Sequence, residues 1–508
     1  MDYKQCLMQE QFRRMVDRNT IRKFLKRFAA NHDRDAAAQR TVIFFPGGMG
    51  SELARANRKF DPALPSGSYS YDTVWYDVLG VLFNRRVLEL DMAGDLDRDG
   101  RIVVADGAIE NCLFGAYDDF ETWCEDKNLD LLVVGWDFRR SGDWAVEFFF
   151  DYLLPGVRAE AAKEHLPDPF EKTAIVGHSF GGMLVKWILN RHADPFCQNL
   201  QLAVTVAAPF YGSAGQAHRY FDGEPLAGLT TAASQIAKVI ATMKGGYSLL
   251  FLDESTYDTY RPELSADPEF PLLSYPSIDH DTGSRVDPYN PLPGGGGEIR
   301  YPDHWAWFSD YLDEGLKAYR QVAVPLDASV AHKLHCIRGV QWRDNAAKRG
   351  TAVSQRWHWF DRTEGKSAVW EKDPEDFGAG DGVIPAWSAR LATQPPENIH
   401  TIKGRLHHTF IMDDTDVRSK LLTLLRGLPA PPEQQIAPGE KRIDPAPRDD
   451  FYAMRDGLEG IVGSKPEATA KVQVGLRIAK LSVTDRQAFM KRWYMELLRG
   501  PLMPLKDR

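Results

Sequence analysis

Residues 173–185 read TAIVGHSFGGMLV, a β-branched apolar run that enters a Gly-x-Ser-x-Gly pentapeptide and leaves it as a helix-forming stretch. This order is typical of a strand, a sharp turn and a helix in which the central serine sits in the turn with its hydroxyl exposed. Gly177 and Gly181 suit such a turn because any side chain there would collide with the neighbouring strand or helix. A bare pentapeptide often arises by chance, so the flanking strand and helix carry the prediction that Ser179 is a nucleophile.

Further apolar runs indicate the fold around this turn. From residue 41 the chain alternates short apolar strands with helical stretches, which is the pattern of a mostly parallel sheet with helices on both faces. We therefore predict an α/β protein, specifically an α/β-hydrolase fold with a mostly parallel central sheet, a cap or lid insertion and a C-terminal helical extension. The predicted strands are Thr41–Phe45, Leu131–Val134, Thr173–Val176, Leu202–Val206 and Leu334–Ile337.

The chain of 508 residues is long enough for more than one unit. Residues 1–40 are basic, with apolar residues at helical intervals, and predict an amphipathic helix. Residues 41–427 form the predicted hydrolase domain, and its strand-helix alternation is interrupted by a cap or lid insertion at about 213–330. A proline-dense linker, 428–450, precedes a helical extension at 451–508.

A catalytic serine needs a base and a carboxylate that orients the base. In α/β-hydrolases the acid follows the serine along the chain and the histidine comes last. Asp381 lies in a Gly-Asp-Gly turn after sequence that could hold a late strand, which would bring it to the edge of the site. A plain surface Asp-Gly turn is the alternative.

Two adjacent histidines, His407 and His408, come before the last helix predicted for this domain. In many hydrolases the base is followed by two residues, an apolar pair, an acid and, further on, a valine. Counting from His408 matches this spacing at residues 411, 412 and 417, whereas counting from His407 misplaces the apolar pair and the valine by one. His408 is therefore the predicted base, with Asp381 holding its second ring nitrogen.

The glycine-rich loop after the first strand suits an oxyanion hole. Such a hole combines the backbone N–H after the nucleophile, here that of Phe180, with an N–H from this loop. Glycines let the backbone approach the developing oxyanion without a Cβ in the way. A simple structural turn would explain the glycines in isolation, but not their coincidence with Ser179.

Several blocks in the same order resemble the lecithin:cholesterol acyltransferase family, which includes lysosomal phospholipase A2. The similar blocks are Pro46–Leu53, Gly135–Arg139, Gly177–Gly182, Ala208–Ser213, Gly380–Pro385 and His408. The resemblance implies a serine esterase that forms an acyl-enzyme and passes the acyl group to water or an alcohol, usually from a glycerophospholipid. It also implies that Gly48 takes the oxyanion position, with Phe180 as its partner.

Composition and charge limit the classes of partner that we expect. A net charge of −9 with 26% charged residues gives no indication of nucleic-acid binding. The five cysteines include no Cys-x-x-Cys pair and the N-terminus lacks the pattern of a secretory signal, so we expect a cytoplasmic protein. Peripheral membrane contact through residues 1–40 is one option; packing of that helix on the core is the other. The partner of residues 451–508 is unassigned.

One acidic segment has the spacing of a calcium loop. Asp95, Asp97, Asp99 and Asp106 occupy ligand positions, with aspartate where the usual loop has glutamate. An Asp-rich hairpin turn is the alternative, since no paired motif follows. No other metal and no organic cofactor is expected.

The predicted function is therefore that of a serine esterase or acyltransferase acting on carboxylic esters, with a lipid or phospholipid as the favoured substrate. The alternatives are a carboxylesterase or lipase on neutral esters, an amidase, and a non-catalytic interaction protein on a hydrolase scaffold.

Overall fold

A computed structural model of the chain describes most of residues 2–427. The described residues are 2–35, 41–75, 90–93, 96–108, 117–213, 215–216, 239–267, 269–272, 274–289, 305–341, 353–354, 357–360, 369–372, 377–404, 406, 408–427 and 453–454. The proline-dense segment 428–450, nearly all of the predicted C-terminal extension, much of the predicted cap, Asp95 and His407 therefore lie outside them. The limits of the predicted units stay predictions.

Six parallel strands form the central sheet, in the order β16-β11-β9-β8-β1-β7. Their bounds are β1 Thr41–Phe45, β7 Asp130–Val133, β8 Thr173–His178, β9 Leu202–Val206, β11 Leu334–Gln341 and β16 Ile399–Gly404. The five predicted strands are all present, each with its ends shifted by a few residues at most. The sixth, β16, was not predicted and lies at one edge of the sheet.

Both faces of this sheet are buried, as its strand sequences require. Along β1, Val42 and Phe44 belong to one apolar cluster, whereas Ile43 and Phe45 belong to another. Because side chains alternate between the faces of a strand, the two clusters are the two faces of the sheet. The first face packs against α4 (Asp118–Asp126) and α15 (Thr415–Arg426). The second packs mainly against α5 (Gly142–Phe148), α6 (Leu154–Lys163) and α7 (Phe180–Leu189), with a π-helical turn at Phe149–Leu153 between α5 and α6.

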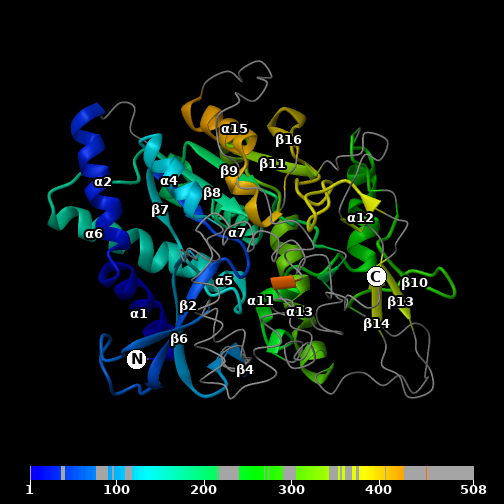
Figure 1. Ribbon diagram of the computed structural model, residues 1–508, viewed down its shortest axis with the longest axis horizontal. Helices are drawn as coiled ribbons and strands as arrows, with labels where there is room; N and C mark the ends of the chain where they lie inside the picture. Colours follow the sequence, from blue (N-terminus) through cyan, green and yellow to red (C-terminus); the bar gives the residue numbers. More distant parts are fainter. Residues whose placement is uncertain are drawn as a thin grey trace.

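This arrangement of a parallel sheet between two helical layers, with a sharp turn from β8 into α7, is the α/β-hydrolase fold (Figure 1). The predicted α/β-hydrolase fold with a mostly parallel central sheet is confirmed, whereas the cap and the C-terminal helical extension stay predictions.

Residues 3–35 form two helices, where the sequence predicted one. Helix α1 spans Tyr3–Asp17, with Arg18 as its C-cap, and α2 spans Thr20–Asp35. Between them Asn19 takes a left-handed conformation with φ 64°. The apolar side chains of both helices are buried against β6 and β7: Cys6, Leu7, Met8, Met15, Ile21, Phe24, Leu25 and Phe28. The packing alternative therefore holds for residues 3–28, and their apolar face is not available to a membrane.

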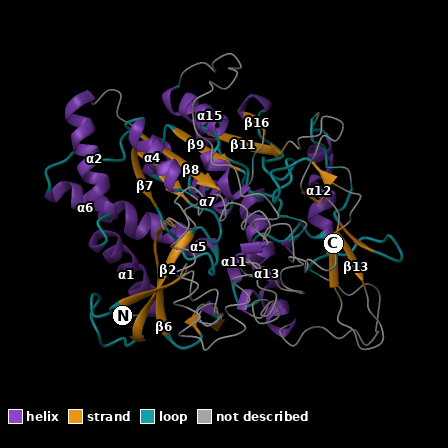
Figure 2. Cartoon of the chain, in the orientation of Figure 1, coloured by secondary structure: helices purple, strands orange, loops and turns teal. Residues whose placement is uncertain are grey.

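An antiparallel sheet in the order β3-β2-β6 lies beside α1, which packs against β6 (Figure 2). Its strands are β2 Ser51–Lys59, β3 Tyr71–Trp75 and β6 Arg101–Ala108. A short hairpin, β4 Met92–Ala93 and β5 Leu96–Asp97, precedes β6. Strand β2 begins at Ser51, directly after the loop that follows β1, so the sheet holds the far end of that loop.

The short elements not yet named are α8 Pro195–Asn199, α14 Ala328–Ala331, β12 Val353–Ser354 and β15 Phe377–Gly378, with 3-10 turns at Pro396–Asn398 and His408–Asp413. Another group of described elements lies on the side of the molecule away from α1 and α2 (Figure 1): α11 Lys244–Tyr247, α12 Glu254–Ser265, α13 Trp305–Ala323, β10 Ser277–Asp279, β13 Trp357–Phe360 and β14 Val369–Lys372. Asp267, just after α12, is buried and accepts hydrogen bonds from Arg338 on β11 at 2.6 Å and from Arg390 at 2.8 Å. These bonds tie the region to the sheet. Among the described helices, none has the length and apolar character needed to cross a bilayer.

Candidate active site

The turn between β8 and α7 holds Ser179 in a conformation that few non-glycine residues adopt. Its backbone has φ 54° and ψ −126°, and its N–H donates to Val206 O at 2.8 Å. A Cβ at Gly177 would come 2.3 Å from Gly181 O, and one at Gly181 would come 2.2 Å from Phe45 O. No side chain fits at either glycine, as the sequence motif predicted. Ser179 itself is half-buried between two buried neighbours, so its hydroxyl remains accessible.

The hydroxyl of Ser179 is the first member of a hydrogen-bonded series. His408 Nε2 lies 2.9 Å from Ser179 Oγ, and His408 Nδ1 lies 2.7 Å from Asp381 Oδ2. Asp381 is only 1% exposed and His408 7%. The structure thus brings together the three residues that the sequence singled out from positions far apart along the chain.

Asp381 is held in a tight turn at the carboxyl end of β11. The N–H of Gln341, the last residue of β11, donates to Gly380 O at 2.8 Å. The second carboxylate oxygen, Asp381 Oδ1, accepts the N–H groups of Val383 at 3.1 Å and Ile384 at 2.8 Å. These bonds fix the rotation of the carboxylate, so that Oδ2 faces His408. The strand expected just before Asp381 is only the two-residue β15, which pairs with β12 outside the central sheet.

All parts of the site meet at the carboxyl edge of the central sheet. Ser179 follows β8, the loop at residues 46–50 follows β1, and His408 comes soon after β16. Loops at this edge are where α/β proteins gather their functional residues, because the parallel strands all end there.

The loop at residues 46–50 lies directly against the nucleophile turn. A Cβ at Gly47 would come 2.9 Å from Ser179 Cβ, whereas one at Gly48 would meet nothing nearer than the Phe180 ring at 3.7 Å. Trp136 holds the loop from the other side, because its indole Nε1 donates to Pro46 O at 2.9 Å. The N–H groups of Gly48 and Phe180 donate no hydrogen bond to any other described residue.

Sequence reasoning missed two residues beside this loop, Tyr117 and His178. The Tyr117 phenol oxygen accepts the N–H of Gly47 at 2.8 Å and lies 2.8 Å from His178 Nδ1. The His178 ring packs against that of His408 with centroids 4.9 Å apart. Burial, and next to it the proximity of His408, hold the pKa of His178 well below its ordinary value, so its ring is neutral. His178 lies within the pentapeptide, but no sequence signal pointed to Tyr117.

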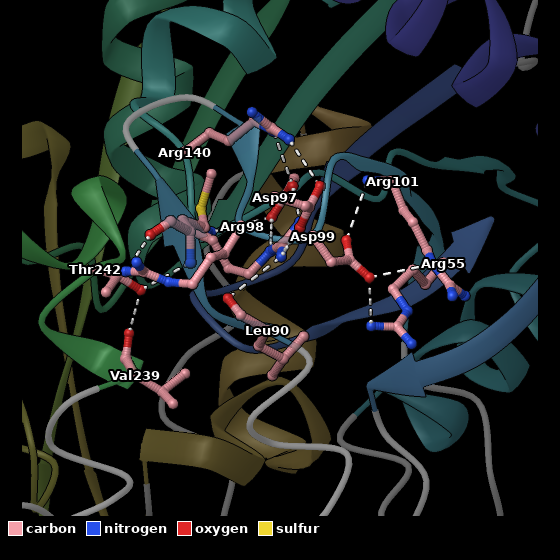
Figure 3. A network of polar contacts seen from close by, with 12 residues as sticks. Arg55, Leu90, Asp97, Arg98, Asp99, Arg101, Arg140, Val239 and Thr242 are labelled. Carbon is pink, nitrogen blue, oxygen red and sulfur yellow. Dashed lines mark hydrogen bonds and ion pairs between the residues drawn. The ribbon is translucent and has the colours of Figure 1, made fainter. Parts of the chain in front are cut away.

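The acidic segment is a strand, a turn and a strand, not a loop between helices. Figure 3 shows Asp97 beside Arg140, and Asp99 beside Arg55 and Arg101. In the part of the chain that the structure describes, no group of three or more His, Cys, Asp or Glu side chains is arranged to hold a metal ion. The ion pairs are Asp97 with Arg139 at 2.6 Å, Asp99 with Arg55 at 3.1 Å, and Asp106 with Arg14 at 2.8 Å.

The innermost of these pairs belongs to a buried charge network after β7. Arg139 lies between Asp97 and Asp137, with Nη2 2.7 Å from Asp137 Oδ2. Burial alone would raise the pKa of Asp137, but Arg139 and Arg140 hold it below its ordinary value. The Asp137 carboxylate is thus kept charged by guanidinium groups, and the network anchors the segment that carries Trp136.

Comparisons with known proteins find partial similarity only. No family model matches the chain. Phospholipase A(1) LCAT3 of Arabidopsis thaliana is 28% identical over 89 residues, which are 18% of this chain and 19% of that protein. Lecithin-cholesterol acyltransferase-like 4 of the same organism is 30% identical over 95 residues, 18% of this chain and 16% of that protein. The chain thus spans less than a fifth of the length of either relative.

One similar solved structure is described as the crystal structure of the Tle4-Tli4 complex. The likeness has a TM-score of 0.43 and 14% identity, over 77% of this chain and 98% of that one. The sequence matches point loosely to the same family as the motifs above.

Proposed function

We propose that the protein is a serine hydrolase of carboxylic esters, with Ser179 as nucleophile, His408 as general base and acid, and Asp381 as the residue that orients His408. The observation that carries this proposal is the hydrogen-bonded series from Ser179 Oγ through both ring nitrogens of His408 to Asp381 Oδ2. The series begins at a turn in which Ser179 has a positive φ, a backbone conformation that few non-glycine residues adopt.

The first half of the reaction forms an acyl-enzyme. With Nδ1–H donated to Asp381, His408 Nε2 is free to take the Ser179 proton as Oγ attacks the ester carbonyl carbon. The N–H groups of Gly48 and Phe180 donate hydrogen bonds to the oxyanion of the tetrahedral intermediate and so stabilise its negative charge. When the intermediate collapses, the ester C–O bond breaks and His408 returns its proton to the leaving alcohol.

The second half releases the acyl group. His408 deprotonates water or an alcohol, which attacks the acyl carbonyl carbon, and the Ser179 oxygen leaves with the proton that His408 gives back. If water is the acceptor, the product is a free acid and the reaction is a hydrolysis. If an alcohol is the acceptor, the product is a new ester and the reaction is an acyl transfer.

A lipid ester is the proposed substrate class. The sequence matches to proteins named as a phospholipase and an acyltransferase-like protein support it, although they cover only part of each chain. A neutral-ester lipase or carboxylesterase is the second candidate, because the same three residues would serve it equally well.

Two experiments test the proposal. A fluorophosphonate probe should label the wild-type protein and leave Ser179→Ala unlabelled; equal labelling of both would refute Ser179 as the nucleophile. A panel of phospholipids, neutral glycerides and short acyl esters, with and without an added alcohol, then separates phospholipase, neutral lipase and transferase by the mass of the products. Absence of Ser179-dependent turnover on every ester would leave the amidase and the non-catalytic alternatives.

A further inference from the structure

Behind the nucleophile turn lies a second polar pair that the proposed reaction does not use. Tyr117 immediately precedes α4 and is 2% exposed, and His178 is the last residue of β8 and 3% exposed. They come from different elements, yet their polar atoms approach to 2.8 Å. The edge of the Tyr117 ring rests on Phe44 of β1, with centroids 5.0 Å apart, so the phenol has little freedom to move.

The phenol oxygen occupies the inside of the loop at residues 46–50. A Cβ at Gly47 would lie 3.3 Å from it, and a Cβ at Gly50 only 2.9 Å. The same oxygen accepts the N–H of Gly47 at 2.8 Å, and the N–H of Gly50 closes the turn on Gly47 O at 3.0 Å. The loop is thus folded around one oxygen atom.

These bonds limit which N–H groups of the loop can serve the reaction. The N–H of Gly47 is committed to Tyr117 and that of Gly50 to Gly47 O, whereas those of Gly48 and Met49 donate to no other described residue. Gly48 also lies beside Phe180, which supplies the other proposed donor. A loop held at Gly47 keeps the next peptide group in one orientation, and preorganised donors are the ones that stabilise an oxyanion most.

We infer that Tyr117, fixed by His178, is a positioning residue that holds the Gly47–Gly48 segment so that the Gly48 N–H faces the oxyanion. This inference rests on the proposed function, since it assigns a role within that reaction. In this role Tyr117 acts through the backbone of Gly47, whose N–H its phenol oxygen accepts.

His178 fits this role because it is an uncharged partner beside the base. Its ring packs on His408, which gains a proton in each half of the reaction. A second positive charge there would oppose that protonation, but burial lowers the pKa of His178 and keeps it neutral. His178 can therefore hold the phenol without disturbing the base.

The test compares two tyrosine-to-phenylalanine variants. Tyr117→Phe removes the oxygen that accepts Gly47 N–H. Tyr69→Phe is the matched control, because the Tyr69 phenol oxygen also accepts a backbone N–H, that of Asp61 at 3.1 Å, and Tyr69 is 5% exposed in the antiparallel region. Relative to the control, Tyr117→Phe should lose about ten- to a hundred-fold in kcat on a short acyl ester with KM within about two-fold.

A transition-state analogue provides a readout that mere loss of stability would not give. A trifluoromethyl ketone adds Ser179 Oγ to its carbonyl and places an oxyanion in the hole. Tyr117→Phe should weaken its inhibition by the same factor as kcat/KM. If Tyr117→Phe lowers the Tm more than the control does, His178→Gln replaces it in the test. We then expect a smaller fall in kcat, again with KM nearly unchanged.

The outcomes separate this inference from the proposed function. Turnover that survives Ser179→Ala would refute the proposed function. An inactive Ser179→Ala together with a Tyr117→Phe that matches Tyr69→Phe in kcat and in ketone inhibition would refute the positioning role alone. A loss confined to KM would refute it as well.

Discussion

Asp381 and His408 are joined twice, once through their side chains and once through their backbones. His408 Nδ1 lies 2.7 Å from Asp381 Oδ2, and the backbone N–H of His408 donates to Asp381 O at 2.9 Å. The backbone bond holds the two segments together whatever the side chains do. Position and charge can therefore be separated by experiment at this pair.

Asp381→Asn should keep the fold and lose most of the activity. The amide is nearly isosteric, but it removes the negative charge and no longer fixes the His408 tautomer that accepts the Ser179 proton. We expect kcat to fall about 10⁴-fold, with the Tm close to that of wild type. The control is Asp413→Asn, on the 3-10 turn that begins at His408, whose carboxylate accepts from Arg418 at 2.9 Å. Equal activity of the two variants would refute the role of Asp381.

Gly181→Ala and Gly48→Ala should differ sharply although both add one methyl group near Ser179. The methyl at Gly181 would lie 2.2 Å from Phe45 O, so the strand-to-helix turn must shift. At Gly48 the nearest atom would be 3.7 Å away, and the backbone N–H is retained. We expect Gly181→Ala to lose more than about 3 kcal/mol of stability or fail to fold, and Gly48→Ala to fold and keep kcat within about ten-fold. Urea unfolding and ester turnover of both variants check this. Similar free energies of unfolding for the two variants would contradict the close approach of Gly181 to Phe45.

Lys186 should make stability depend on pH. It lies on α7, is buried, and donates to Asn190 Oδ1 and to the carbonyl oxygens of Gln321 and Val324 at 3.3 and 2.8 Å. Burial lowers its pKa from 10.5 to about 7. Between these values the unfolded chain binds more protons than the folded one, so the free energy of unfolding rises with pH, by at most about 1.4 kcal/mol per unit.

Lys186→Met should remove that slope. Urea unfolding from about pH 7 to about pH 10 gives the free energy of unfolding of both proteins. The value for wild type minus that for Lys186→Met should increase as pH rises. The comparison cancels other groups that titrate in this range. A difference that stays constant would show that Lys186 keeps its charge throughout.

Calcium should not stabilise the protein. Asp97, Asp99 and Asp106 already pair with arginines, and an ion would have to displace these. Added calcium at about a millimolar should therefore leave the Tm and the ester turnover unchanged. Arg139→Met is the companion variant: it removes one of the two guanidinium groups that Asp97 and Asp137 share, leaves Arg140 as the other, and should cost about 3–5 kcal/mol. A rise in Tm with calcium would support the ion-binding alternative.

The sequence predicts the central sheet well where strands are buried on both faces. Thr41–Phe45 and Leu202–Val206 are continuous apolar runs, which few other structures would accept. Strand β16 escapes such reasoning, because Ile399–Gly404 reads IHTIKG and an edge strand needs few apolar residues. Strand β2 is harder still, since SELARANRK is made largely of helix-favouring residues and becomes a strand only by pairing with β3 and β6.

The same limit applies to the candidate site. Ser179, Asp381 and His408 could be proposed from local motifs, because each stands in a turn with its own sequence pattern. Tyr117 could not, because its role depends on a contact with Gly47 and His178 that only the folded chain creates. The calcium spacing has a related limit, because the pattern shows the carboxylates but not the arginines that pair with Asp97, Asp99 and Asp106 in the folded chain.

The bond between Gln341 N–H and Gly380 O, at 2.8 Å, has a consequence for how this protein could vary. The chain leaves β11 at Gln341 and returns beside the same strand end at Gly380. Because this bond closes the stretch at its base, and the free-energy cost of closing a loop grows only slowly with loop length, changes in the length of residues 342–379 should leave Asp381 in place. Insertion or exchange of sequence between the two bonded residues is therefore the change that best leaves the candidate site intact.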